Sequence, residues 1–118
     1  MVLREAGLPF TPVRVDLQLH TFDGVDYHSV NARGYVPLLE LDDGQRLTEG
    51  PAILQYVADQ VPEKKLAPAW GTTERYRLIK WLAFISGELH ENLGPLFSPV
   101  MSGDEKDFHL MCVLDRFQ

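Results

Sequence analysis

The longest regular pattern in the sequence is an apolar repeat in its second half. The repeat advances by four, three, four and four residues, through Leu78, Leu82, Ile85, Leu89 and Leu93. Residues at this spacing share one face of an α-helix, so the pattern predicts a long helix over about 72–93 that Gly94-Pro95 ends. A further helix is expected from Asp104. The second half is therefore predicted to be a set of helices.

The first half carries shorter elements of mixed type. Gly7 and Pro9 end a short helical pattern. Asp42-Asp43-Gly44 separates the segments 38–41 and 45–48, as the turn of a β-hairpin does. In order, the sequence predicts the end of a helix at 2–8, a strand at 13–17, an irregular or partly helical connection at 18–34, a hairpin of 38–41 and 45–48, and a helix from Pro51 to about 60.

A change of composition separates the two halves. Residues 63–71 contain glutamate, two lysines, proline and glycine, a mixture typical of a linker. We therefore predict an α/β domain over 1–62, a linker over 63–71 and the start of an all-helical domain over 72–118.

Composition excludes several classes of function. The 118 residues include 11 Lys and Arg against 17 Asp and Glu, a net charge of −6, which does not favour nucleic acid or anionic membranes as partners. No apolar run approaches the roughly 18 residues of a membrane span. The single cysteine, Cys112, is interpreted as a small core residue, and the four histidines lack the spacing of metal-binding motifs. We expect a cytoplasmic protein that holds no metal.

Val36-Pro37 is the first candidate site. The residue before a proline is restricted to extended geometry. Most X–Pro bonds are trans, and Pro37 can be read as an ordinary trans proline at a strand start. The surrounding pattern favours a cis bond instead, which would leave the Val36 N–H and C=O free to pair with an extended peptide.

Thr48-Glu49-Gly50-Pro51 is the second candidate site, at the start of a predicted helix. The N–H groups of a helix N-terminus suit a carboxylate ligand, and Gly50 allows a ligand to approach the backbone closely. Glu49 could hold an ammonium group, so together the two residues match a zwitterionic amino acid. The alternative is a plain strand-to-helix turn with a solvated glutamate.

His90 is the third candidate, next to the apolar stripe of the long helix. A single histidine in such a place is commonly a packed or solvated side chain. The functional alternative is a hydrogen-bond donor that recognises a thiolate or a carboxylate at the junction of the two domains.

Taken together, these segments resemble the glutathione transferases, most closely the bacterial beta class. The matching stretches are Leu3–Phe10, Val15–Leu17, Asn31–Pro37, Leu41–Gly44, Leu47–Ile53, Tyr56–Asp59, Trp81-Leu82 and Glu88–His90. The resemblance implies an incomplete thioredoxin-like N-terminal domain, without the family's first strand, followed by the start of its all-α domain. The family's thiol-activating residue lies in that missing segment, so no catalytic residue is expected in this chain.

The resemblance also implies a ligand and a role for each candidate residue. Val36, beside a cis-Pro37, would pair with the cysteinyl backbone of glutathione, the co-substrate. Glu49 and Gly50 would hold the γ-glutamyl end, and His90 would reach the site from the helical domain. Full-length relatives conjugate the glutathione thiol to small hydrophobic electrophiles, as cytoplasmic dimers. A non-catalytic module that binds glutathione or another thiol peptide, and an inactive truncated relic, are the alternatives.

Overall fold

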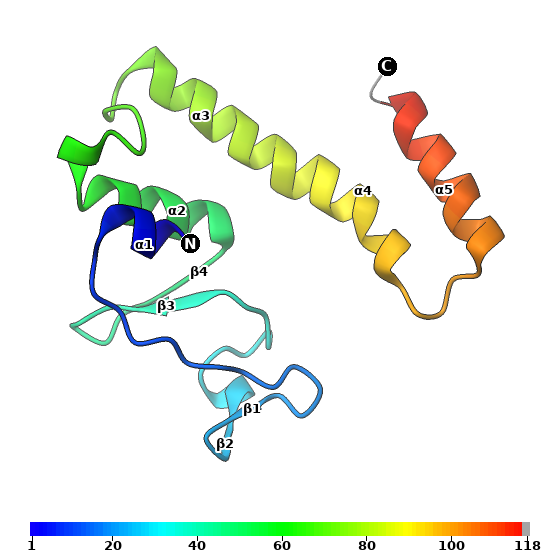
Figure 1. The fold of residues 1–118 in the computed structure, drawn as a ribbon, viewed down its shortest axis with the longest axis horizontal. Helices are drawn as coiled ribbons and strands as arrows, with labels where there is room; N and C mark the ends of the chain where they lie inside the picture. The colour runs from blue at the N-terminus through cyan, green and yellow to red at the C-terminus, as the bar shows by residue number, and fades with distance from the viewer. Residues whose placement is uncertain (117–118) are drawn as a thin grey trace. The chain divides into compact units, whose positions relative to one another are not determined.

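The computed structural model of this chain describes residues 1–116. It contains two compact units, and the division between them in the sequence falls between Pro68 and Ala69. Figure 1 shows the course of the chain through both. The elements of the first unit are α1 (Val2–Ala6), β1 (Thr21–Phe22), β2 (Val25–Asp26), the 3₁₀ turn η1 (Tyr27–Ser29), β3 (Leu38–Glu40), β4 (Arg46–Thr48), α2 (Gly50–Asp59) and the 3₁₀ turn η2 (Pro62–Lys64).

The core of the first unit lies between its helices and the β3–β4 hairpin. Ile53 and Val57 lie one turn apart on α2 and are buried, together with Ala6 of α1 and Val61. Leu39 and Leu47, which face each other across the hairpin, pack against this cluster. Figure 1 shows α1 beside α2, as their contacts require. The apolar faces of two short helices thus cover one small sheet.

The predicted hairpin is confirmed. β3 and β4 are antiparallel, with Leu38 opposite Thr48 and Glu40 opposite Arg46. The turn between them is closed by the Asp43 carboxylate, which accepts a hydrogen bond of 2.9 Å from the Gln45 N–H. The predicted ending of the first helix at Gly7 is also confirmed.

The predicted strand over 13–17 is wrong. Within residues 1–116, these positions form no ladder, and only Asp16 makes a single antiparallel bridge, to Thr21. Alternating apolar and polar residues indicate an extended segment. A β-strand also needs a neighbouring strand that pairs with its backbone N–H and C=O groups. The connection over 18–34, expected to be irregular or partly helical, contains the short β1–β2 hairpin, whose turn is Asp23-Gly24, and the 3₁₀ turn η1.

The second unit is helical, as predicted. Its elements are α3 (Thr73–Phe84), the π-helical segment η3 (Ile85–His90), α4 (Glu91–Leu93), the 3₁₀ turn η4 (Gly94–Phe97) and α5 (Gly103–Arg116). Thr72 caps α3, because its hydroxyl accepts a hydrogen bond from the Arg75 N–H. α5 is joined to α4 by the His109 ring, whose Nε2 donates to the Asn92 carbonyl at 2.6 Å.

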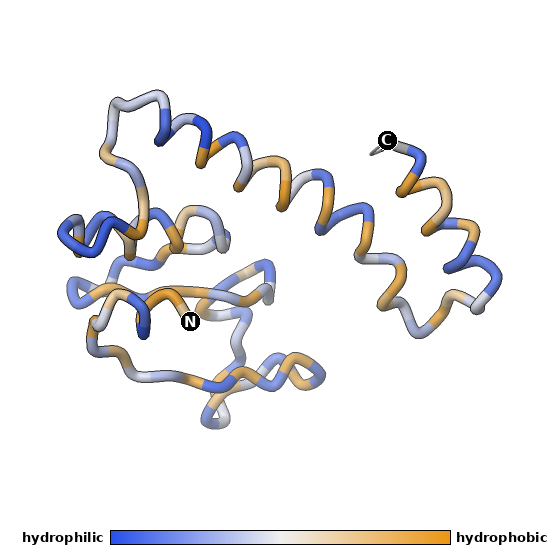
Figure 2. The backbone as a smooth tube through the Cα atoms, turned by 45° about the horizontal axis from the view of Figure 1, so that its top comes forward, coloured by the Kyte–Doolittle hydropathy of each residue, from blue (hydrophilic) through white to orange (hydrophobic). Residues whose placement is uncertain are grey.

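The long helix has the predicted extent but not the predicted uniform geometry. Six of its residues, Ile85–His90, are π-helical. The apolar stripe advances by more residues per turn than the 3.6 of an α-helix, so an α-helical stripe would drift around the axis. A wider π turn takes up the excess and keeps Ile85, Leu89 and Leu93 in line. Figure 2 shows apolar residues, in orange, returning along this helix.

Cys112 is exposed, so its interpretation as a core residue is wrong. The buried residue of α5 is Val113, one turn after the half-buried His109. The side of the helix that carries Phe108, Met111 and Cys112 is exposed instead. Over residues 1–116, helices long and apolar enough to cross a membrane are absent.

Candidate functional site

The peptide bond between Val36 and Pro37 is cis, as the sequence pattern favoured. Val36 is partly exposed and lines an open pocket with Leu17, His20, Gly34 and Tyr35. Among the hydrogen bonds of residues 1–116, none uses the Val36 N–H or C=O. Both groups are therefore available to an extended peptide that docks beside this residue.

The peptide that precedes Val36 is fixed by two side chains. The Tyr27 hydroxyl and the Asn31 side-chain amide both donate to the Tyr35 carbonyl, at 2.9 and 2.7 Å. Tyr27 is 3% exposed, so its hydroxyl is held in place by packing around the ring. Sequence analysis did not identify Tyr27 or Asn31 as site residues. Both side chains act through the backbone carbonyl of Tyr35, and such a contact has no sequence motif. Asn31 is nevertheless the first residue of the matching stretch Asn31–Pro37.

Glu49 and Gly50 lie where β4 runs into α2. Glu49 has φ 68° and ψ 114°, a backbone conformation that residues other than glycine rarely adopt. No side-chain hydrogen bond caps the helix there. Gly50 is the first residue of α2, and a Cβ added to it would have no neighbour within 4 Å. The first N–H groups of α2 and the positive end of its dipole are thus next to an exposed carboxylate.

The hairpin register brings the two predicted parts of the site together. Leu38 is paired with Thr48 at the end of the β3–β4 ladder. Val36 and Pro37 directly precede that pair in one strand, and Glu49 and Gly50 directly follow it in the other. All four predicted residues therefore lie at the same end of one hairpin. A ligand extended along this end could contact the Val36 backbone and the Glu49 carboxylate at once.

Two histidines that sequence analysis did not select line the neighbouring surface. The rings of His20 and His28 stack with their centroids 4.7 Å apart. Within the described residues, the buried His20 Nδ1 atom has no hydrogen-bond partner. The turn that leads to His20 is held by Asp16, whose pKa is lowered by hydrogen bonds from the Leu19 and Gln18 N–H groups. The two histidines are eight residues apart and share no motif that would have marked them.

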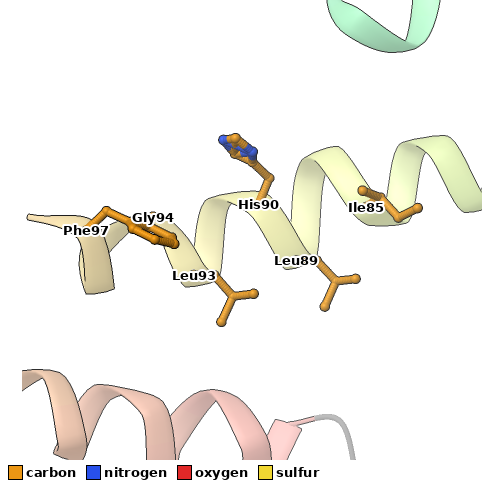
Figure 3. Close-up of a pocket in the computed structure, with 6 residues that line it drawn as sticks. All are labelled: Ile85, Leu89, His90, Leu93, Gly94 and Phe97. Carbon is orange, nitrogen blue, oxygen red and sulfur yellow. The ribbon is translucent and has the colours of Figure 1, made fainter. Parts of the chain in front are cut away.

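His90 lies in the second unit, on the π-helical segment, and is exposed. It lines a shallow apolar pocket with Ile85, Leu89, Leu93, Gly94 and Phe97. Figure 3 shows its ring on the other side of the helix from the Leu89 and Leu93 side chains. The ring is therefore open to a partner outside this helix. Over residues 1–116, no group of three or more His, Cys, Asp and Glu side chains is placed to hold a metal.

Residues 1–60 match the sequence model of one family, described as "Glutathione S-transferase, N-terminal domain". The chain belongs to the glutathione S-transferase family. The relative "Glutathione S-transferase GstA" of Escherichia coli O157:H7 is 49% identical over 100 residues, which are 84% of this chain and 50% of that protein. The chain spans about half the length of the curated relatives it matches.

Solved glutathione S-transferase structures have the same fold. The bacterial beta-class enzyme of Sphingomonas chungbukensis is 46% identical, with a TM-score of 0.88 over 98% of this chain and 58% of its own. A sphingomonad glutathione S-transferase complexed with glutathione is 45% identical, with a TM-score of 0.89 over the same shares. These likenesses confirm the predicted class, a thioredoxin-like N-terminal part followed by helices, and the resemblance to the beta class.

Proposed function

We propose that the β3–β4 hairpin binds glutathione, and that the protein transfers the glutathione thiol to electrophilic substrates. The observation that carries the proposal is the register that places Val36 and Glu49 at one end of the hairpin. The Val36 N–H and C=O would pair with the cysteinyl residue, whose extended backbone needs one donor and one acceptor. Glu49 would hold the γ-glutamyl ammonium, and the first N–H groups of α2 would face the γ-glutamyl carboxylate.

Thiol transfer requires the thiolate, which is the nucleophile. Its sulfur forms a bond to an electrophilic carbon, and a leaving group departs with the electron pair of the broken bond. In this scheme the hairpin residues bind and orient glutathione beside the electrophile. We assign no catalytic residue. The apolar pocket of Ile85, Leu89, Leu93 and Phe97 offers a nonpolar surface to small hydrophobic electrophiles. A hydrogen bond from His90 to glutathione and a homodimer in the cytoplasm stay predictions of the family resemblance.

Loss of the Glu49 charge tests glutathione binding. We expect Glu49→Gln to weaken binding by about tenfold to a hundredfold, because a hydrogen bond to a charged group contributes roughly 1.5–3 kcal/mol. Isothermal calorimetry with glutathione measures the change. Glu40→Gln is the matched control, since Glu40 is another exposed glutamate of the same hairpin that pairs with an arginine. Equal affinities of wild type and Glu49→Gln, in a folded chain, would contradict the proposed function.

A methyl group at residue 50 tests whether the ligand approaches the α2 backbone. We expect Gly50→Ala to leave the fold intact, because its Cβ would meet no atom within 4 Å. The methyl group would lie where the ligand carboxylate approaches, so glutathione binding should weaken by at least about fivefold, roughly 1 kcal/mol. Gly103→Ala at the start of α5, where a Cβ also has no neighbour, is the matched control. Unchanged affinity in Gly50→Ala would place the ligand elsewhere.

A further inference from the structure

Arg33 is the cationic residue that reaches the glutamate of the candidate site. Its Nη1 atom lies 3.6 Å from Glu49 Oε1, and the two side chains are 75% and 66% exposed. The backbone of Arg33 is held by a tight turn, in which its N–H donates to the Asn31 side-chain oxygen at 3.2 Å. Asn31 also fixes the Tyr35 carbonyl. The arginine therefore extends from the same turn that positions Val36.

The Arg33–Glu49 ion pair is loose, whereas another ion pair of the hairpin, Arg46–Glu40, is tight. Arg46 Nε lies 2.9 Å from Glu40 Oε2, and Arg46 also donates to the Val30 carbonyl. An exposed ion pair at 3.6 Å with both partners in solvent contributes little to stability, so separating it costs little. The charges of Arg33 and Glu49 are thus available to a ligand, at the end of the hairpin that carries Val36.

A zwitterionic head group is the ligand that matches two adjacent opposite charges. Its ammonium group can take the place of Arg33 beside the Glu49 carboxylate, while its carboxylate accepts hydrogen bonds from the Arg33 guanidinium. One loose ion pair is exchanged for two, and the four charges alternate in sign. The planar guanidinium has donors spaced for the two oxygens of a carboxylate, a geometry that an ammonium group does not offer.

We propose that Arg33 and Glu49 form a zwitterion clamp, in which Arg33 binds the α-carboxylate and Glu49 the α-ammonium of the ligand's γ-glutamyl head group. The inference rests on the proposed glutathione site and deepens it, because it makes Arg33 a specificity-determining residue for ligands with a free α-amino acid end. Peptides that present the same cysteinyl backbone without that end would bind weakly.

The test combines one substitution with one change in the ligand. Calorimetry at fixed ionic strength compares wild type, Arg33→Gln and the control Arg46→Gln, with glutathione and with its analogue whose γ-glutamyl α-carboxylate is an amide. We expect Arg33→Gln to weaken glutathione binding about tenfold and the amide analogue to bind wild type about tenfold more weakly. The two losses should not add, because each removes the same contact. Arg46→Gln should stay within twofold of wild type.

Two results would overturn the clamp alone. Arg33→Gln could bind glutathione as well as wild type, or more tightly, which would mean that Arg33 only competes with the ligand for Glu49. The losses from the substitution and from the amide could also be additive, which would separate Arg33 from the carboxylate. In each of these cases the glutathione site itself would stand. Absence of glutathione binding by a folded wild-type chain would instead remove the proposed function, and the clamp with it.

Discussion

Glu49→Gly is expected to stabilise the fold and at the same time to remove most of the glutathione affinity. Glu49 has φ 68° and ψ 114°, outside the left-handed region that non-glycine residues occasionally occupy. Such a conformation costs on the order of 1–3 kcal/mol, and glycine adopts it without that cost. The greater freedom of glycine in the unfolded chain offsets about 0.4–1 kcal/mol of the gain. We therefore expect a net increase of about 1 kcal/mol in the free energy of unfolding.

The same substitution removes the carboxylate that would hold the ligand ammonium. We expect glutathione affinity to fall by at least as much as in Glu49→Gln, about tenfold or more. Urea denaturation measures the stability change and calorimetry the binding change. The two would then move in opposite directions, as expected for a strained residue that is kept for binding rather than for the fold.

Glu40→Gly is the control that separates strain from the general effect of glycine. Glu40 is the last residue of β3 and is paired with Arg46 in the ladder, so the backbone freedom of glycine there lowers stability, by up to roughly 0.5–1 kcal/mol. We therefore expect opposite signs for the two glycine variants. A loss of stability in Glu49→Gly as large as that in Glu40→Gly would contradict the assignment of strain to Glu49.

Much of the fold could be predicted because its elements are specified locally. The β3–β4 hairpin follows from the turn signal Asp42-Asp43-Gly44 between two short segments, and α2 from Pro51 and its apolar face. The candidate residues Val36 and Glu49 are indicated by equally local signals, which are the proline that follows Val36 and the helix start that follows Glu49. The register then places them at one end without any further information.

The features that sequence reasoning missed depend on contacts between distant residues or on small changes of helix geometry. The segment over 13–17 alternates like a strand, but its state depends on a partner that local pattern does not reveal. The π-helical turn at Ile85–His90 is visible only as an apolar stripe with slightly more residues per turn than an α-helix has. Tyr27 acts through the backbone carbonyl of Tyr35, and Arg33 through an ion pair across the loop. Neither contact leaves a motif.

Gly34→Ala is expected to cost about 2–5 kcal/mol of stability, the largest loss among the single substitutions proposed for this chain. Gly34 has φ +68°, where an L side chain costs roughly 1–2 kcal/mol. A Cβ there would also lie 2.7 Å from His28 Cε1 and 3.2 Å from His20 Nδ1. Forcing a methyl group into such a packed position typically costs a further 1–3 kcal/mol. Urea denaturation measures the sum.

Two further variants divide that loss into its backbone and packing parts. Gly44 has φ +82° but open space around its Cβ position, so Gly44→Ala should cost only the backbone part, about 1–2 kcal/mol. In a His28→Ala background the nearest obstacle is gone, and Gly34→Ala should there cost about as little as Gly44→Ala. A coupling of at least about 1 kcal/mol between residues 34 and 28 is therefore expected. If Gly34→Ala cost no more than Gly44→Ala in the native background, the close packing of the two histidines on Gly34 would be wrong. Gly34 would then serve the turn alone, rather than leaving room for the His20 ring in the wall of the pocket that Val36 lines.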